Sequence, residues 1–302
     1  MLLCRKSVKF MDKSVIIKLN GRMANQMFEW AFGRALMNKN NCNLLFDNSE
    51  ETFKLDYFNL KNQIKFIKKP LLNKFLRKTI PFRKLRNKLT KLNFNNLKNI
   101  EEKSFCHFEQ ELLNISDATY IKGFFQTEKY FADIREDLIQ DFTLNIDLNK
   151  ANKDMLEKIK NSNSISVHFR RGDYTKKRVA DKYGSCSVDY YKNGIKEIAK
   201  TLDEKPTIFI FSDDINWVKN NVNFDYATVY VDINSGKQGY LDLELMKNCK
   251  HNVIANSSFS WWGAWLNTNP NKKVVAPKWW MKDIDSSSCD IIPDNWILLD
   301  NK

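Results

Sequence analysis

Short apolar runs alternate with segments of helical spacing along most of the chain. Residues 15–19 form an apolar run that predicts a buried strand, and residues 26–38 carry apolar side chains at helical intervals before a short strand at residues 44–46. This strand–loop–helix–strand opening is typical of a doubly wound α/β domain. A further segment at residues 120–131 predicts a strand, a loop and a helix.

The alternation resumes after a polar stretch at residues 145–163, which we interpret as the joint between two halves. The expected strands cover residues 164–169, 207–211, 227–231, 252–255 and 273–276, and the expected helices lie around residues 188–202, 215–220, 239–248 and 259–266. Short strands separated by helices predict a parallel sheet with helices on both faces. We therefore expect two α/β domains, residues 1–150 and 151–302.

The composition is that of a folded protein. A hydrophobic fraction of 43% and an aromatic fraction of 13% in 302 residues exclude wholesale disorder. No apolar run approaches the ~20 residues that cross a bilayer, and the N-terminus lacks the apolar segment of a signal peptide. The six cysteines and three histidines lack metal-ligand spacing, so we expect reduced thiols and no metal site.

A net charge of +13 indicates an anionic partner, which could be nucleic acid, a membrane surface or the substrate. Much of this charge lies in residues 61–103, where residues 71–92 have the apolar spacing of two basic amphipathic helices separated by Pro81. These helices could pack on the domain, or they could form a peripheral anchor on an anionic membrane. Nucleic-acid binding is disfavoured, because no nucleic-acid-binding motif accompanies the charge.

The most informative polar pattern is H-x-R-R-x-D, from His168 to Asp173, at the end of an expected strand. The forked guanidinium groups of Arg170 and Arg171 match phosphate oxygens and stay charged at any working pH. Gly172 permits a sharp turn, and Asp173 can pin one arginine so that the other faces a ligand. The alternative is a surface arginine pair with a salt-bridging aspartate.

Two further loops follow expected strands. Asp213 and Asp214 come directly after a strand, where a carboxylate can bind the N1–H and amino groups of guanine or can cap the following helix. Asn256, Ser257 and Ser258 precede a helix whose first N–H groups can bind an anion, or they simply cap a helix whose tryptophans fill the core. Ligands bind beyond the carboxyl ends of parallel strands, so the three loops predict one anion-binding site.

The turn after the first strand is the fourth piece. It reads N-G-R-M-A-N-Q-M-F and holds only Gly21, which disfavours the G-x-G-x-x-G turn of an NAD enzyme. This turn and the segments G-F-F-Q-T-E-K-Y-F, H-F-R-R-G-D-Y, F-S-D-D and A-N-S-S-F-S-W-W-G-A-W resemble, in order, those of the bacterial α1,2-fucosyltransferases of glycosyltransferase family 11. The resemblance covers about residues 15–280, with Arg22 and Ala24 in place of two family glycines.

The resemblance implies an α/β, GT-B-like fold in which two Rossmann-like domains face a cleft. Residues 1–150, with the basic helical insert, would bind mainly the acceptor, and residues 151–302 would bind the GDP-sugar. The family moves L-fucose from GDP-β-L-fucose, with inversion, to the 2-hydroxyl of a terminal β-galactoside, and it is taken to need no metal. A metal-dependent transferase would carry a D-x-D motif after a strand, and Asp213-Asp214 lacks that spacing. Another linkage, or a related GDP-deoxysugar, stays open.

The same resemblance implies catalytic roles for Arg170, Arg171 and Asp173. An ion-paired carboxylate is a poor base because its pKa is depressed, so Asp173 can instead be structural, and no general base is assigned. The expected acceptor is a galactose-terminated oligosaccharide or glycolipid of a lipopolysaccharide, lipo-oligosaccharide or capsule. The expected location is the bacterial cytoplasm or the inner face of its membrane. The residues expected to bind substrate are His168, Asp213, Asp214, Asn256, Ser257, Ser258, Phe259, Asn25 and Gln26.

Overall fold

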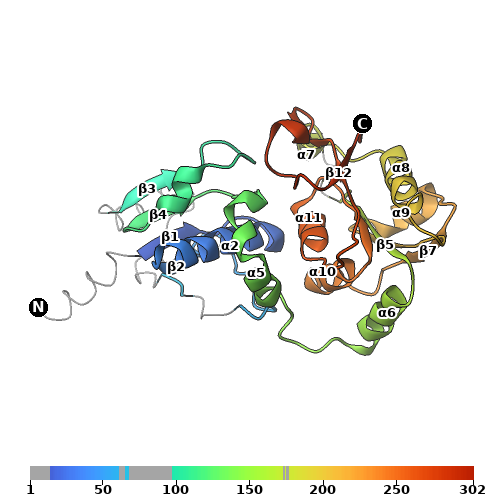
Figure 1. Ribbon diagram of the computed structural model, residues 1–302, viewed down its shortest axis with the longest axis horizontal. Helices are drawn as coiled ribbons and strands as arrows, with labels where there is room; N and C mark the ends of the chain where they lie inside the picture. Colours follow the sequence, from blue (N-terminus) through green and yellow to red (C-terminus); the bar gives the residue numbers. More distant parts are fainter. Residues whose placement is uncertain (1–13, 61–64, 68–96, 173, 175–176) are drawn as a thin grey trace, which may run out of the picture. The chain divides into compact units, whose positions relative to one another are not determined.

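The computed structural model divides into two compact units, Met1–Phe142 and Thr143–Lys302, which we call the N-terminal and the C-terminal unit (Figure 1). The basic helices expected at residues 71–92 lie outside the described residues, and so does Asp173. In the described part of the chain, no helix has both the length and the apolar composition needed to cross a membrane. The structure describes residues 14–60, 65–67, 97–172, 174 and 177–302.

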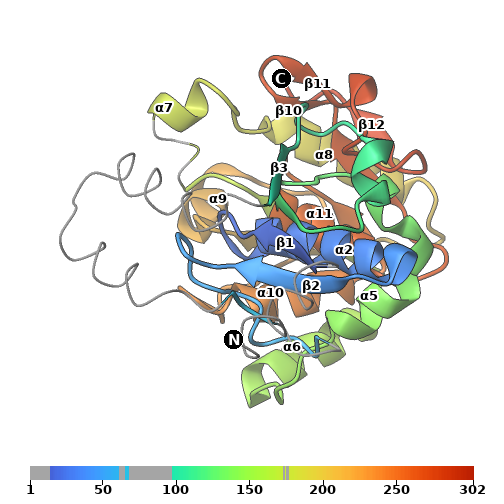
Figure 2. The same cartoon turned by 90° about the vertical axis from the view of Figure 1, so that its left-hand side faces the viewer.

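A four-stranded parallel sheet, with strand order β2-β1-β4-β3, forms the core of the N-terminal unit (Figure 2). Helix α2 connects β1 to β2 on one side, while β4 and β3 lie on the other side of β1, so the strand order switches between β1 and β4. The elements are β1 Ser14–Lys18, α2 Met23–Asn40, β2 Asn43–Asp47, β3 Lys98–Glu101, β4 Thr119–Lys122 and α5 Arg135–Asp141.

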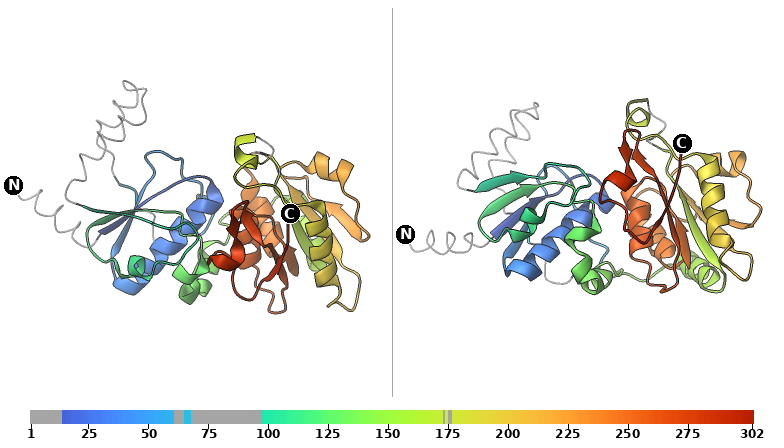
Figure 3. Two further views of the ribbon diagram at one scale, coloured as in Figure 1. Left: turned by 90° about the horizontal axis from the view of Figure 1, so that it is seen from above. Right: turned by 45° about the horizontal axis from the view of Figure 1, so that its top comes forward.

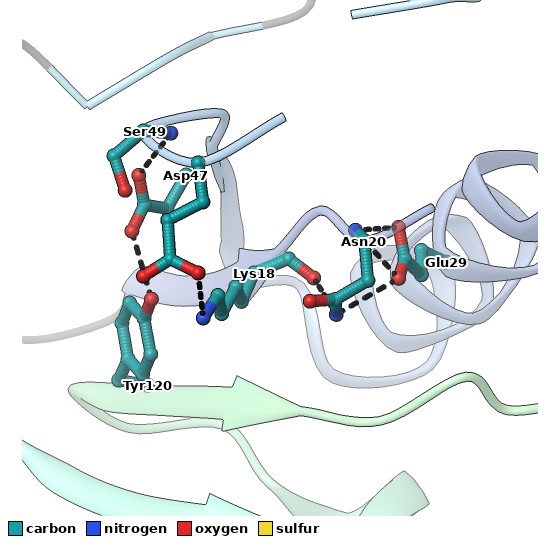
Figure 4. A network of polar contacts seen from close by, with 7 residues as sticks. Lys18, Asn20, Glu29, Asp47, Ser49 and Tyr120 are labelled. Carbon is teal, nitrogen blue, oxygen red and sulfur yellow. Dashed lines mark hydrogen bonds and ion pairs between the residues drawn. The ribbon is translucent and has the colours of Figure 1, made fainter. Parts of the chain in front are cut away.

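A buried carboxylate holds the turn that follows β1 (Figure 4). Glu29 of α2 accepts hydrogen bonds from the backbone N–H and the side-chain Nδ2 of Asn20, at 3.0 and 3.1 Å. The Glu29 side chain is fully buried, and burial raises its pKa well above the ordinary value. Gly21 takes the left-handed conformation of this turn, with φ of 69°, whereas Ala24 lies inside α2. The alanine in place of a family glycine therefore causes no backbone strain.

A six-stranded parallel sheet, with strand order β12-β9-β8-β5-β6-β7, forms the core of the C-terminal unit. Its order switches between β5 and β8. The strands are β5 Ser164–Phe169, β6 Thr207–Ser212, β7 Ala227–Tyr230, β8 His251–Val253, β9 Val274–Pro277 and β12 Ile297–Leu299. The helices are α6 Lys150–Lys160, α7 Lys177–Ala180, α8 Val188–Ala199, α9 Ile215–Asn221, α10 Gly239–Lys247 and α11 Ser258–Trp265. Trp279–Met281 (β10) and Ile284–Asp285 (β11) form a small antiparallel pair.

Helices cover both faces of this six-stranded sheet (Figure 3). On β6, Ile208 and Ile210 pack with α8 and α9, whereas Phe209 and Phe211 pack with α6 and α10. This division follows from the two-residue period of a strand, which sends successive side chains to opposite faces. The predicted parallel sheet with helices on both faces is therefore confirmed.

Several elements differ from those that the apolar pattern predicts, and the short elements β10, β11, β12 and α7 are not predicted. Strand β3 is not predicted, because its four residues are largely polar and exposed and show no apolar alternation. The helix expected near residue 128 is a single 3-10 turn, Glu128–Tyr130 (η3), which Thr127 caps by accepting a hydrogen bond from the Lys129 N–H. Local apolar spacing does not distinguish such a turn from the start of an α-helix.

A network of amides and one carboxyl joins α6 to α10. Asn234, in the loop after β7, donates hydrogen bonds of 2.8 Å to Asp242 and 2.9 Å to Asn152. Burial raises the pKa of Asp242 to about 6, although the hydrogen bond from Asn234 lowers it in part. The folded chain therefore binds this proton more tightly than the unfolded chain does. As the pH rises from about 4 to about 6, the carboxyl makes the fold progressively less stable.

We predict that Asp242→Asn gains stability over the wild type as the pH rises through this range. Asparagine keeps the acceptor for Asn234 but has no proton to lose. The gain in the free energy of unfolding should reach about 1–3 kcal/mol, since one pKa unit corresponds to about 1.4 kcal/mol. Urea denaturation at about pH 4.5 and about pH 7.5 measures it. The exposed Asp147→Asn is the matched control, and an equal pH effect of both substitutions would contradict the prediction.

Candidate functional site

The pairing of β5 with β6 brings the arginine loop beside the aspartate loop. The two strands are parallel and stay in register to their last residues, so Arg170 and Arg171 leave the sheet next to Asp213 and Asp214. Successive residues of an extended chain point to opposite sides. Accordingly, Arg170 contacts Asp213 and Arg171 contacts Asp214, in two separate pairs.

Asp213 holds the arginine turn. Its carboxylate accepts a 2.5 Å hydrogen bond from Nη1 of Arg170, and the N–H groups of Arg171 and Gly172 donate to it at 2.8 and 3.0 Å. A Cβ on Gly172 would lie 2.6 Å from this carboxylate, so any other residue here would displace the carboxylate from its present position. Burial raises the pKa of Asp213, but the N–H donors and the Arg170 charge outweigh burial and lower it overall. Asp213 thus has the pinning role suggested for Asp173, which is not among the described residues.

An aromatic ring holds Arg171. The guanidinium carbon lies 3.3 Å from the ring centroid of Trp217 in α9, and Nε lies 3.7 Å from Oδ2 of Asp214. That Nε is buried and has no hydrogen-bond partner in the described part of the chain. Asp214 also caps α9 by accepting a 3.3 Å hydrogen bond from the Trp217 N–H, which is the capping role considered above. The sequence did not reveal the role of Trp217, because no local spacing links a tryptophan in α9 to an arginine in the loop after β5.

His168 lies near the end of β5, two residues before Arg170. The residue is 4% exposed, its Nδ1 has no hydrogen-bond partner among the described residues, and its ring lies 5.5 Å from that of Phe259 in α11. Burial lowers the pKa of His168 to about 4; the charge of Asp213 raises it and that of Arg170 lowers it. The imidazole is therefore neutral near pH 7, so it can form hydrogen bonds to a ligand but contributes no charge.

The start of α11 is linked to the arginine loop through Tyr174. The Tyr174 hydroxyl donates to the carbonyl of Asn256 at 3.0 Å, and the guanidinium carbon of Arg170 lies 5.3 Å from the tyrosine ring. Ser257 caps α11 by accepting a 3.4 Å hydrogen bond from an N–H of the first turn, and Ser258 is the first helical residue. The structure thus brings the arginine loop, the histidine and the helix start to one edge of the sheet.

Two residues expected to bind substrate use their side chains to hold loops. The buried Asn256 amide donates to three carbonyls at 3.1–3.2 Å, those of Tyr183 and Gly184 in the segment after α7 and that of Trp280 in β10. Gln26, which is fully buried in the N-terminal unit, bonds to the backbone of three residues: Gly21, Thr52 and Lys54. Buried amides need such partners. Asn25 lies half-buried in the same unit and accepts a 3.1 Å hydrogen bond from Gln126.

The arrangement in the C-terminal unit can bind an anion with several oxygens. The two guanidinium groups supply positive charge and paired hydrogen-bond donors. The first N–H groups of α11 can donate further hydrogen bonds, and the dipole at the start of a helix favours a negative charge. The neutral His168 can add a hydrogen bond. Within the described residues, no group of three or more His, Cys, Asp or Glu side chains is placed to hold a metal ion.

Comparison with known sequences places this site in a family context. The family model described as Glycosyl transferase family 11 matches residues 3–300. An alpha-1,2-colitosyltransferase of Escherichia coli is 32% identical, over 95% of this chain and 99% of the relative. An O-antigen biosynthesis glycosyltransferase of Escherichia coli is 30% identical, over 93% of this chain and 99% of the relative. A galactoside 2-alpha-L-fucosyltransferase of Bos taurus is 24% identical, over 83% of this chain and 63% of the relative.

Comparison with solved structures concerns the fold alone. A mutant of Arabidopsis thaliana FUT1 in complex with GDP superposes with a TM-score of 0.50 at 9% identity, covering 91% of this chain and 74% of that chain. The predicted α/β fold with parallel sheets, of the GT-B class, is confirmed by this likeness together with the two sheets described above.

We predict that the chain binds GDP and that Trp217→Leu weakens this binding about 3–10-fold, whereas Trp217→Phe retains most of the affinity. Leucine preserves the apolar packing of α9 but offers Arg171 no aromatic face. Isothermal titration with GDP measures the affinity, and circular dichroism checks the fold. In an Arg171→Ala background, Trp217→Leu should have little further effect. Fully additive losses in the double variant would mean that the tryptophan acts independently of the arginine.

Proposed function

We propose a reaction for this chain on one premise: the chain belongs to glycosyl transferase family 11, whose model matches residues 3–300. We infer that it is an inverting glycosyltransferase that moves L-fucose from GDP-β-L-fucose to the 2-hydroxyl of a terminal β-galactoside. The observation that carries the choice of a nucleotide-sugar donor is the arginine pair at the end of β5, beside the start of α11. The name of the Bos taurus relative supports the sugar and the linkage.

In the proposed reaction, the acceptor oxygen loses its proton and attacks the anomeric carbon while the bond to the diphosphate breaks, so GDP leaves and the configuration inverts. Catalysis then consists of aligning the reacting groups and stabilising the charge that develops on the β-phosphate. We assign the contact with the β-phosphate to Arg170, since Tyr174 links this arginine to the start of α11. Arg171, oriented by Trp217, shares the diphosphate, and Ser257 and Ser258 bind the remaining phosphate oxygens.

We assign guanine recognition to Asp214. Its side chain is 39% exposed, whereas Asp213 already accepts hydrogen bonds from one guanidinium and two backbone N–H groups. A carboxylate in this position can accept hydrogen bonds from the N1–H and the amino group of the base. Because two arginines can neutralise a leaving diphosphate, we propose that transfer needs no metal ion.

A related GDP-deoxysugar is the second candidate donor. The observation that favours it is the name of the 32% identical relative, an alpha-1,2-colitosyltransferase. The other Escherichia coli relative is named for O-antigen biosynthesis, which supports a bacterial surface glycan as the acceptor. Both candidates share the proposed GDP site and differ only in the sugar.

The deciding experiment is a transfer assay in the presence of EDTA. GDP-fucose and GDP-colitose are each supplied with lactose, N-acetyllactosamine or a galactosyl-β1,3-N-acetylhexosamine, and the linkage of the product is read by NMR. We predict a 2-O-fucosyl product that forms without added metal. Preference for GDP-colitose would replace fucose by the second candidate, and a product with another linkage would overturn the assigned 2-hydroxyl.

Arg170→Ala is the matched variant for this assay. The substitution should reduce transfer to below a few per cent of the wild-type rate, because the charge on the departing phosphate loses its main partner. The fold should persist, since Asp213 keeps its two backbone N–H donors. Substantial activity in a folded Arg170→Ala variant would remove this arginine from the reaction.

We also propose that the protein acts at the cytoplasmic face of a bacterial membrane, in peripheral contact with anionic lipid. The sequence supports this, because residues 61–96 contain twelve Lys and Arg residues and no Asp or Glu. We predict co-sedimentation with phosphatidylglycerol vesicles, weakened by salt, and none with phosphatidylcholine vesicles. Replacing four of these basic residues with glutamine should abolish co-sedimentation with phosphatidylglycerol vesicles and leave transfer to lactose unchanged. The four residues are Lys74, Arg77, Lys78 and Lys84. Equal vesicle binding by this variant would refute the contact.

A further inference from the structure

The N-terminal unit has a switch in strand order of its own. The switch lies between β1 and β4, and in open parallel sheets ligands bind beyond the carboxyl ends of the strands at such a point. The loop after β4 is joined there to the first turn of α2, the helix that follows β1, because Nε2 of Gln126 donates a 3.1 Å hydrogen bond to Oδ1 of Asn25. The position of this edge in the topology makes it a candidate for binding a second ligand.

An exposed aromatic side chain stands in the loop after β4. Among the described residues, three large apolar side chains are exposed to solvent, and only one of them is aromatic: Phe124 (37% exposed), Ile146 and Ile297. Its neighbour Phe125 is fully buried and stacks on Phe32, with 3.9 Å between the ring centroids. The apolar pair in this loop is therefore divided, with one ring in the core and the other at the surface.

The backbone of this loop is fixed in the conformation that presents Phe124. Phe125 has a φ of 51°, which is unfavourable for a residue with a side chain. Glu102, directly after β3, accepts hydrogen bonds from the N–H groups of Phe124 and Phe125 at 2.8 and 3.3 Å. A Cβ on Gly123 would lie 2.7 Å from both the Cβ of Glu102 and the ring of Phe125, so this close packing also requires glycine.

We propose that Phe124 is the platform on which the galactose ring of the acceptor stacks, with Glu102 as the positioning residue that holds the platform. Galactose presents a face of C–H groups, and their weak positive charge is attracted to the negative face of an aromatic ring. This inference rests on the proposed function, which assigns the nucleotide to the C-terminal unit and leaves the sugar acceptor to be bound elsewhere.

The test compares Phe124→Leu and Phe124→Tyr with the wild type in the transfer assay. Leucine keeps an apolar surface but removes the aromatic face, so the KM for N-acetyllactosamine should rise about 10-fold while the KM for the donor stays unchanged. Tyrosine should retain the wild-type KM. Ile297→Ala, which removes an exposed apolar side chain from the C-terminal unit, is the control and should alter neither constant.

Direct binding separates failure of this inference from failure of the proposed reaction. Saturation-transfer NMR with lactose reports acceptor binding whether or not sugar is transferred. If Phe124→Leu loses the lactose signal and the wild type transfers no fucose, the role of Phe124 in acceptor binding is supported and the proposed reaction is wrong. An unchanged lactose signal and acceptor KM in Phe124→Leu overturns the platform, as does a rise in the KM for the donor, which would indicate a contact with the nucleotide instead.

Discussion

The hydrogen bonds that Asp213 accepts fix the turn on which the candidate site depends. One carboxylate binds the Arg170 guanidinium and two consecutive backbone N–H groups, so it sets the course of the chain and the direction of the arginine together. Those donors keep the pKa of Asp213 low despite burial, so the carboxylate stays charged and the turn stays closed. A side chain at Gly172 would displace this carboxylate, which accounts for the glycine of the motif.

Carboxylates hold loops at the carboxyl edge of both sheets, but their pKa values are shifted in opposite directions. Glu29 and Glu102 in the N-terminal unit accept backbone N–H groups as Asp213 does, yet burial raises the pKa of both, whereas the pKa of Asp213 is lowered by its N–H donors and an arginine. In the N-terminal unit, Tyr120 reaches across β1 to donate its hydroxyl to Asp47 (Figure 4). The arginines paired with Asp213 and Asp214 make the C-terminal edge suited to an anion.

Residues of the same sequence motif divide between ligand binding and loop support. Asn256 and Gln26 stand within segments that point to the family, yet each amide bonds to groups of its own unit and holds loops there, with the Cys186 thiol as a side-chain partner of Asn256. The arginines, the neutral His168 and the start of α11 remain as the groups with the chemistry for a diphosphate. Membership of a glycosyltransferase family and this arrangement therefore support the same type of donor, while the transferred sugar depends on contacts that family membership does not specify.

The sequence by itself determined the α/β class, most elements of the C-terminal sheet and the three strand-end loops, because apolar periodicity and strand-end position are local properties. It missed β3, whose exposed polar residues carry no such periodicity. Only the tertiary structure decided which aspartate holds which arginine, because the register of β5 and β6 sets those pairs. The stacking of Trp217 on Arg171 and the surface position of Phe124 were likewise decided by the tertiary structure. Each depends on where a distant segment packs, which local spacing does not encode.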